Sequence, residues 1–271
     1  MRRLALYAAA LLIFLWSASP FIWQFSTSFQ LDRALTSGSP VLWPDPWTFE
    51  HYRNVFVEKQ LHRYVLNSLL VALATTFLCL AIGSLAAFAL SRLRMRGRFG
   101  ILMTILSVSM FPQITLVGPL YIVASELGLL DTFTALVLVY IALVLPLVTW
   151  VLYGYLETLP REIDEAARMD GVGPLRLYWS IILPMSLPSL VTTGLLAFIT
   201  AWNEFLFALA FTSNIDTQTI PVGIANFTNL YYVPWGDIAA ASAVVTAPLI
   251  LLVLFFQRHI IEGLTQGGIK E

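Results

Sequence analysis

The sequence contains unusually little charge. Only 11% of its 271 residues are Asp, Glu, Lys or Arg, whereas 58% are hydrophobic. Soluble domains carry roughly 25% charged and about 45–50% apolar residues. Because a surface facing water needs more charge than this chain supplies, its apolar surface must face another medium, and lipid is the expected one. The formal net charge of −1 also excludes a broad basic face for nucleic acid.

Lysine, cysteine and histidine are scarce as well. The two lysines, Lys59 and Lys270, do not lie in a G-x₄-G-K-[ST] phosphate loop, so ATP hydrolysis would require another polypeptide. Cys79 has no second cysteine to pair with and is expected simply to pack. The histidines show no metal-ligand spacing: His51, His62 and His259. No G-x-S-x-G or H-E-x-x-H motif occurs, so we expect neither enzyme activity nor a metal site in this chain.

Six apolar stretches are long enough to cross a hydrocarbon core, which takes about 20 helical residues. They lie near residues 4–25, 64–89, 99–124, 133–156, 185–211 and 238–256. In lipid a helix satisfies its backbone hydrogen bonds internally, whereas a β-barrel would show short alternating segments instead of continuous runs. The sequence predicts an all-α membrane protein with six transmembrane helices in a single domain over residues 1–271.

Basic residues are spread unevenly over the segments between these spans. The N-terminal segment, residues 90–98, residues 157–184 and the C-terminal segment hold most of the 15 Lys and Arg residues. The alternate segments hold only Arg33, Arg53, Lys59 and Arg63. Because Lys and Arg favour the cytoplasmic side of a membrane, we expect both termini and residues 157–184 to be cytoplasmic.

Residues 157–184, here called the elbow, read ETLPREIDEAARMDGVGPLRLYWSIILP. Pro160 fits a first helical position, and acids follow in the first turns, where the helix dipole favours them. Gly171 suits a left-handed C′ position. Pro174, after Gly173, can start a second helix that runs to Pro184. The pattern therefore predicts a short helix, a sharp corner and a second helix leading into the fifth span, a rigid unit suited to passing force to a soluble partner.

The elbow resembles the EAA-x₃-G-x₉-I-x-L-P loop of ABC importer permeases. Every motif position matches: Glu165, Ala166, Ala167, Gly171, Ile181, Leu183 and Pro184. Further stretches are similar to carbohydrate-type permeases, namely WPDPWTFEHYRNVF at 43–56, AWNEFLFALAFT at 201–212 and, with slight departures, the tail at 263–271. The resemblance covers essentially the whole chain and is nearest to the smaller permease subunit of maltose-type and trehalose-type systems.

The resemblance implies a subunit of an assembly in the bacterial inner membrane. The implied partners are a second homologous permease, two cytoplasmic ATP-binding subunits that hold ATP and Mg²⁺, an extracytoplasmic substrate-binding protein and a sugar; this chain would hold no cofactor. The elbow, with Asp170 and Gly173 beside the motif residues, would dock in a cleft of an ATP-binding subunit. Glu165 would offer a carboxylate, Ala166 and Ala167 would allow close helix approach, and Gly171 would form the corner. The alternative is a solvated helix whose alanines reflect helix propensity alone.

Polar residues inside the predicted spans are candidates for a transport path. Asn203 and Glu204 lie in the fifth span, and intramembrane ionisable residues usually face a bundle interior or a wet cavity. They would line the path or a gate, or make an interhelical hydrogen bond. In the third span, Met110 and Gln113 flank Pro112, which can break the helix and free a carbonyl; a plain structural kink is the alternative.

Two other classes of function compete with an importer permease. A self-contained secondary transporter or channel for a small polar solute would need coupling residues in the membrane core, and usually more spans or an inverted repeat. An intramembrane enzyme would need a catalytic constellation that the sequence lacks. Nothing in the sequence identifies the sugar.

Overall fold

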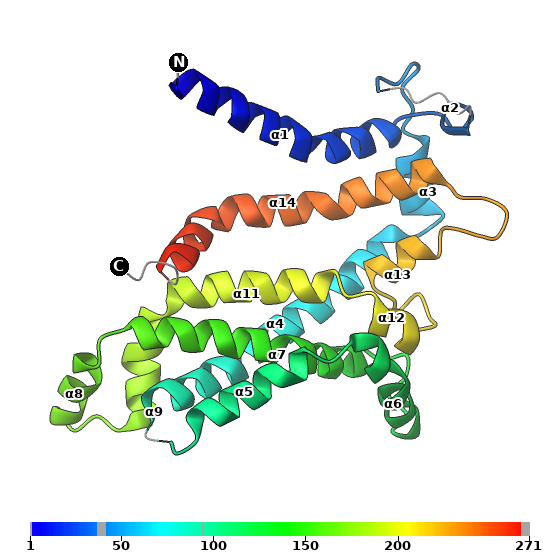
Figure 1. Ribbon diagram of the computed structural model, residues 1–271. Helices are drawn as coiled ribbons and strands as arrows, with labels where there is room; N and C mark the ends of the chain where they lie inside the picture. Colours follow the sequence, from blue (N-terminus) through cyan, green and yellow to red (C-terminus); the bar gives the residue numbers. More distant parts are fainter. Residues whose placement is uncertain (1, 37–41, 94, 267–271) are drawn as a thin grey trace. The chain divides into compact units, whose positions relative to one another are not determined.

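The computed structural model describes residues 2–36, 42–93 and 95–266, and these contain helices but no strand. The all-α prediction is therefore confirmed. In chain order the elements are α1 (Arg2–Thr27), α2 (Asp32–Thr36), α3 (Glu50–Val57), α4 (Leu61–Arg92), α5 (Arg98–Ser109), α6 (Gln113–Glu126), α7 (Phe133–Thr158), α8 (Glu162–Met169), α9 (Pro174–Leu177), η1 (Tyr178–Ile182), α10 (Leu183–Met185), α11 (Leu187–Trp202), α12 (Leu206–Phe211), α13 (Ile220–Ala225) and α14 (Trp235–Gln266) (Figure 1). The end of the predicted tail motif, residues 267–271, lies outside the described residues.

The chain folds into two compact units. The first unit comprises Met1–Val65 and Ile220–Ile250, and the second unit comprises Leu66–Thr219 and Leu251–Glu271. Helices α4 and α14 each run from one unit into the other. The single transmembrane domain stays a prediction.

Four helices of the described chain are long and apolar enough to cross a membrane: α1 over Leu6–Thr27, α4, α7, and α14 over Trp235–Gln257. Two further pairs qualify together but are sharply bent. Helices α5 and α6 meet at 89°, and the helical run Pro174–Met185 meets α11 at 78°. The structure thus offers four to six spans. The predicted stretches 99–124 and 185–211 are both broken in the structure, the first at Pro112, as its proline predicted, and the second unexpectedly.

The breaks have local causes. Helix α5 ends at Ser109, and Pro112 precedes α6 with φ −59° and ψ 121°. Proline has no N–H to donate and its ring clashes with the preceding turn, so the helix stops there as Pro112 predicted. In the other stretch, α11 ends at Trp202, and the carboxylate of Glu204 accepts hydrogen bonds from the backbone of the next helix, α12. A side chain that caps a new helix competes with continuation of the old one.

The second unit is built around α7, along which α5 and α11 pack (Figure 1). Its core contains Val144, Val148, Leu152 and Leu156, spaced four residues apart on one face of α7. Gly83 lets α4 approach this face, since a Cβ there would lie 2.7 Å from Cγ1 of Val148. Cys79 is fully buried in the same cluster, which confirms that it packs as an ordinary core residue.

The first unit has a smaller core, in which Val55 of α3 and Leu61 of α4 meet Phe227, Ala240 and Ala241. Aromatic rings extend this core: Phe29 lies 5.1 Å from Trp47 and 5.1 Å from Tyr52, measured between ring centroids. Burial of apolar side chains thus holds together segments of this unit that are far apart in sequence.

A buried histidine joins three segments of the first unit. Nδ1 of His51 lies 2.8 Å from a carboxylate oxygen of Asp237, in the first turn of α14, and Nε2 lies 2.8 Å from the carbonyl oxygen of Gln30. Gly236 makes room for the ring, because a Cβ at this position would overlap it. Asp32 lies 3.8 Å from Nε2 and also accepts a hydrogen bond from the hydroxyl of Tyr232.

Candidate functional site

The first arm of the elbow is α8, whose sequence gives it one buried and one exposed face. Asp164 and Ala167, three residues apart, are buried, whereas Glu165, Ala166 and Asp170 are exposed. Acidic residues fill the first turn, as the helix dipole favours. The helix begins at Glu162 with Arg161 as the N-cap residue, so the prediction of Pro160 as its first residue is wrong by two positions.

The corner of the elbow is formed by Gly171, which has φ +74°. Its N–H donates to the carbonyl of Arg168, and the N–H of Val172 donates to the carbonyl of Ala167. This pair of bonds is the Schellman motif, which closes the carbonyls at a helix end and needs a left-handed residue at C′. The predicted left-handed glycine is therefore confirmed, and it is exposed, with no heavy atom within 4 Å of the point that a Cβ would occupy.

The second arm begins at Pro174, as predicted, and continues through α9, η1 and α10 to Met185. Its middle is a π-helical turn in which the N–H of Leu183 donates to the carbonyl of Tyr178. Pro184 comes next, and in a regular α-helix its ring would clash with the carbonyl of Ser180. Widening the turn relieves this clash, and such turns occur often at functional sites.

Arg92 anchors the elbow to the helices behind it. It ends α4, is 3% exposed, and its guanidinium donates to a carboxylate oxygen of Asp164 at 3.1 Å. The same group donates to the carbonyls of Leu156 at 2.5 Å and Leu159 at 2.9 Å, at the C-terminus of α7. A cation is favoured at a helix C-terminus. One side chain therefore joins α4, α7 and α8.

From the sequence, residues 90–98 were predicted to be cytoplasmic because they are basic, but neither Arg92 nor Asp164 had a predicted role of its own. A signal was present, since Asp164 and Ala167 share one face of α8, and an acid on the buried face of a short amphipathic helix needs a cationic partner. Its partner is 72 residues away in sequence, and nothing in the pattern points to it.

The exposed face of the elbow carries the motif residues Glu165, Ala166 and Gly171, together with Gly173. Large apolar side chains that the motif does not include are exposed beside them: Met169 (88%), Leu175 and Trp179. Ala167 instead lies in the core of its own unit, so its small side chain permits a close approach within this chain. Ile181 and Leu183 pack partly against the same core, whereas Pro184 is exposed.

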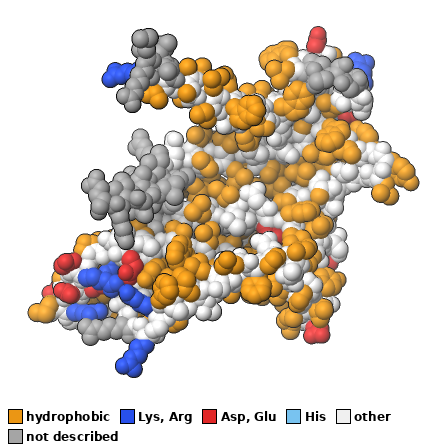
Figure 2. All heavy atoms as spheres, in the orientation of Figure 1, with side chains coloured by type: hydrophobic (Ala, Val, Ile, Leu, Met, Phe, Trp, Pro, Cys, Tyr) orange, Lys and Arg blue, Asp and Glu red, His pale blue; other side chains and the backbone are white. Residues whose placement is uncertain are grey.

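Apolar side chains cover most of the face seen in Figure 2, and acidic and basic side chains gather over α8 and the neighbouring end of the second unit. The elbow thus combines exposed charge, exposed apolar residues and a rigid anchored backbone. Such a surface can dock against a soluble protein, because aromatic and Met side chains supply the buried core of an interface and charged residues its rim.

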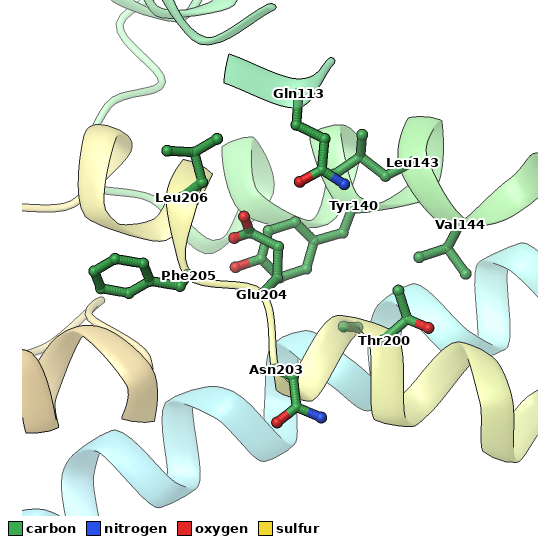
Figure 3. Close-up of a pocket in the computed structure, with 10 residues that line it drawn as sticks. Gln113, Tyr140, Leu143, Val144, Thr200, Asn203, Glu204, Phe205 and Leu206 are labelled. Atoms are coloured by element: carbon green, nitrogen blue, oxygen red, sulfur yellow. The ribbon is translucent and has the colours of Figure 1, made fainter. Parts of the chain in front are cut away.

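A second candidate site is a cavity of about 350 Å³ within the second unit. Its lining is Gln113, Tyr140, Leu143, Val144, Thr200, Ala201, Asn203, Glu204, Phe205 and Leu206 (Figure 3). Three of the four predicted path residues, Gln113, Asn203 and Glu204, are thereby brought together from α6 and from the break after α11. Met110, the fourth, is 83% exposed and does not line the cavity.

The polar side chains of this cavity are fixed by the breaks in the helices. Glu204 accepts hydrogen bonds from the backbone N–H groups of Phe207 at 2.9 Å and Ala208 at 3.1 Å, so it caps α12. Asn203 donates to the carbonyl of Ile199 at 2.8 Å. The ring of Tyr140 lies beside the Glu204 carboxylate (Figure 3). The break between α11 and α12 therefore presents a carboxylate and an amide to the cavity, and α7 adds the phenol of Tyr140.

Metal ligation has no support in the part of the chain that the structure describes, where no group of three or more His, Cys, Asp or Glu is placed to hold an ion.

Comparison with known proteins gives a consistent result. The pattern of the family described as "binding-protein-dependent transport system inner membrane component" matches residues 79–266. The chain is 42% identical over 273 residues to the trehalose/maltose transport system permease protein MalG of Thermococcus litoralis, covering 100% of this chain and 98% of that one. It is 38% identical over 272 residues to the trehalose transport system permease protein SugB of Mycobacterium tuberculosis, covering 99% and 98%.

The fold is shared with a solved structure. A chain from the crystal structure of a bacterial ABC transporter involved in the import of the acidic polysaccharide alginate superposes with a TM-score of 0.79, covering 95% of this chain and 96% of that one at 24% identity. With a family match over most of its length and curated relatives over all of it, the chain belongs to the family of binding-protein-dependent transport system inner membrane components.

Proposed function

We propose that this chain is a permease subunit of an ATP-binding-cassette importer and forms half of the transmembrane path for a disaccharide, oligosaccharide or related polyol. The observation that carries the proposal is the elbow, in which a complete EAA motif forms an anchored helical corner with Glu165, Ala166 and Gly171 exposed. The substrate class follows from relatives over the full chain that are named as trehalose, maltose and sulfoquinovosyl glycerol permeases.

The proposed topology has six spans in the bacterial inner membrane, with both termini and the elbow in the cytoplasm. In this topology each of the four long helices is one span, and each of the two bent pairs of helices is one span. Arg92, Arg96 and Arg98 lie at or between the ends of α4 and α5, and Arg161 lies within the elbow. Their placement supports a cytoplasmic elbow, because basic residues are retained on that side.

The proposed mechanism passes force from an ATP-binding subunit through the elbow. The exposed corner, with Glu165 and Ala166, docks in a cleft of that subunit, and Met169, Leu175 and Trp179 add apolar contact. Because Arg92 bonds to α8 and to the end of α7, a displacement of the elbow moves α4 and α7 with it. ATP and Mg²⁺ bind to two partner subunits, and this chain supplies no catalytic group or cofactor.

The cavity of the second unit is the proposed segment of the transport path. Amide and carboxylate groups such as those of Gln113, Asn203 and Glu204 hydrogen-bond well to sugar hydroxyls, and Tyr140 offers a ring for stacking. A homologous second permease would complete the path, and an extracytoplasmic binding protein would deliver the sugar. Met110 is no longer included in the path, since it does not line the cavity.

The experiment that tests the proposal is purification of the tagged chain in mild detergent, followed by mass spectrometry of the proteins that accompany it. We expect a second permease and an ATPase with a phosphate loop to co-purify with the wild type. Glu165→Arg should lose the ATPase but keep the second permease, because it reverses charge only on the docking face. Glu162→Arg is the matched control, since Glu162 is an exposed acid on the same helix outside the motif.

Retention of the ATPase by Glu165→Arg, or its equal loss in both variants, would contradict docking through the motif. Uptake of a polar solute by the purified chain alone would support the self-contained transporter instead. That result would overturn the importer proposal.

A further inference from the structure

A cleft lined largely by arginine lies at the cytoplasmic end of the proposed spans. It has a volume of about 590 Å³ and lies where α4 ends, α5 begins and α8 is capped. Six described residues line it: Arg92, Leu93, Met95, Arg96, Arg98 and Arg161. The transport path does not use this cleft, and the coupling role of the elbow uses only Arg92 among the lining residues.

The positive charge of the cleft is only partly neutralised within the chain. Arg98 and Arg161 share one carboxylate, that of Glu157, at 3.9 and 3.0 Å. Arg96 forms no ion pair among the described residues, and no acid lines the cleft. The cleft therefore has a surplus of cationic donors, which attracts an anion.

One nitrogen of Arg92, a residue of the cleft lining, is an unsatisfied donor among the described residues. The Nε of Arg92 is buried and has no hydrogen-bond partner in the described part of the chain. Its two other guanidinium nitrogens are engaged by Asp164 and by the carbonyls at the end of α7. A buried donor without a partner is costly, and a ligand oxygen or a water molecule that it binds would relieve this cost.

Apolar side chains next to the cleft indicate which class of anion it would bind. Phe99 is 70% exposed, Ile101 is exposed as well, and both belong to α5 directly after Arg98. Met95, in the lining itself, is also exposed. Because α5 starts a proposed span, Phe99 and Ile101 would face the acyl chains of the bilayer. The arginines would lie at the depth of the lipid head groups. A small free anion would make no favourable contact with these apolar side chains, whereas an amphiphile would bury its acyl chains against them.

We propose that this cleft binds the head group of an anionic glycerophospholipid of the phosphatidylglycerol class. Arg96 and Arg98 donate to its phosphodiester oxygens, for which the planar guanidinium group is well shaped. The acyl chains lie over Phe99 and Ile101. Basic pockets between transmembrane helices on the cytoplasmic side are known to bind the head groups of other anionic lipids, such as cardiolipin. The inference rests on the proposed topology but not on the docking of an ATPase.

The site lies against the anchor of the elbow, because Arg92 belongs both to the cleft and to the ion pair with Asp164. A bound lipid would place negative charge beside Arg92 and hold the segment between α4 and α5 against α8. The lipid would therefore be a structural partner of the elbow, and the membrane would contribute to its rigidity.

The test is binding of lipids to the full-length chain in mild detergent, measured by native mass spectrometry during titration. Phosphatidylglycerol and phosphatidylcholine with identical acyl chains are compared on the wild type and on Arg96→Gln/Arg98→Gln. Each basic residue near a membrane surface strengthens binding to anionic lipid roughly fivefold, so we expect the double variant to bind phosphatidylglycerol about 25-fold more weakly. Phosphatidylcholine should bind weakly to both proteins.

The matched control is Arg33→Gln/Arg53→Gln, which removes the same charge from exposed positions of the first unit. It should bind phosphatidylglycerol like the wild type. Equal binding by the cleft variant and the wild type, or equal weakening by the control, would overturn the site. Inorganic phosphate is added as a competitor. If it displaces the lipid at comparable concentration, the cleft recognises small anions and the lipid assignment is wrong.

Discussion

Arg92 in the second unit and His51 in the first unit are both buried side chains that can carry positive charge and that hold together segments distant in sequence. Arg92 bonds to Asp164 and to two carbonyls at the end of α7. His51 bonds to Asp237 and to the carbonyl of Gln30. Both side chains have an aspartate and backbone carbonyl groups as partners. The two residue types differ in whether their positive charge depends on pH near neutrality.

A guanidinium group has no neutral form near physiological pH. An imidazole carries both N–H groups only when it is protonated, and both ring nitrogens of His51 face oxygen acceptors. The hydrogen bond to Asp237 accordingly raises the pKa of His51 above its usual 6.5, against the opposing effect of burial. The anchor of the elbow thus contains a cation of a type that does not switch near neutral pH, whereas the His51–Asp237 contact of the first unit contains one that does.

The largest effect should come from removing the permanent cation. Arg92→Met leaves Asp164 buried without a partner, which costs about 3–5 kcal/mol. We expect this loss in the free energy of unfolding, measured by denaturant titration in mild detergent. Arg161→Gln removes an exposed pair with Glu157 and should cost less than about 1 kcal/mol. Similar losses in the two variants would show that the buried pair is not an anchor.

The contact between His51 and Asp237 in the first unit can be disrupted by a substitution that adds or removes no charged residue. Gly236→Ala places a Cβ where the His51 ring lies, so the ring must move away from Asp237. We expect a loss of roughly 1–3 kcal/mol in unfolding free energy, as for other overpacked sites. Gly154→Ala, where a Cβ meets no atom within 4 Å, is the control and should be neutral or stabilising. A stable Gly236→Ala protein would mean that the ring tolerates displacement.

The corner of the elbow should respond to backbone strain alone. Gly171→Ala forces a Cβ into a left-handed conformation without any steric neighbour, at a cost of roughly 1–2 kcal/mol. Gly173→Ala is the matched control, because Gly173 has φ −71° and equal free space. Increased proteolysis of the elbow in the first variant but not in the second is the expected result. Equal cleavage would contradict the αL corner.

The smallest expected effect is the pH dependence of stability that His51 gives to the first unit. Because the folded pKa of His51 is raised, its contribution to stability is fully present below about pH 6.5 and is lost as the pH rises through the folded pKa. We expect the wild type to lose on the order of 1 kcal/mol relative to His51→Gln over this rise. The measurement is the unfolding midpoint of both proteins at several pH values above and below 6.5. Parallel pH profiles would refute a charged His51.

Local features of the elbow could be read from the sequence because each depends on one residue. Gly171 adopts the left-handed corner and Pro174 starts the second arm, as their backbone preferences require. Pro112 breaks the third stretch for the same kind of reason. The break at Glu204 was not foreseen, since a carboxylate in an apolar run gives no sign that it will cap a helix.

Features that depend on distant partners could not be read from the sequence. His51 and Asp237 are 186 residues apart, and no periodicity links them. Ala167 was predicted to allow close approach to a docking partner, but it faces the chain's own core, because a small residue suits either contact and the sequence does not distinguish them. The cavity was partly predicted, since polar residues in apolar runs converge where helices break, and Gln113, Asn203 and Glu204 do so.

The central claim is that the elbow couples ATP hydrolysis to transport, and the most direct measurement follows both processes in the same membrane vesicles. The assembly is compared with wild-type chain and with Gly171→Pro, whose φ of about −65° cannot form the corner. The account predicts that the variant remains in the membrane, that ATP is still hydrolysed by the partner subunits, and that sugar uptake is lost. Normal, ATP-dependent uptake by Gly171→Pro would contradict it.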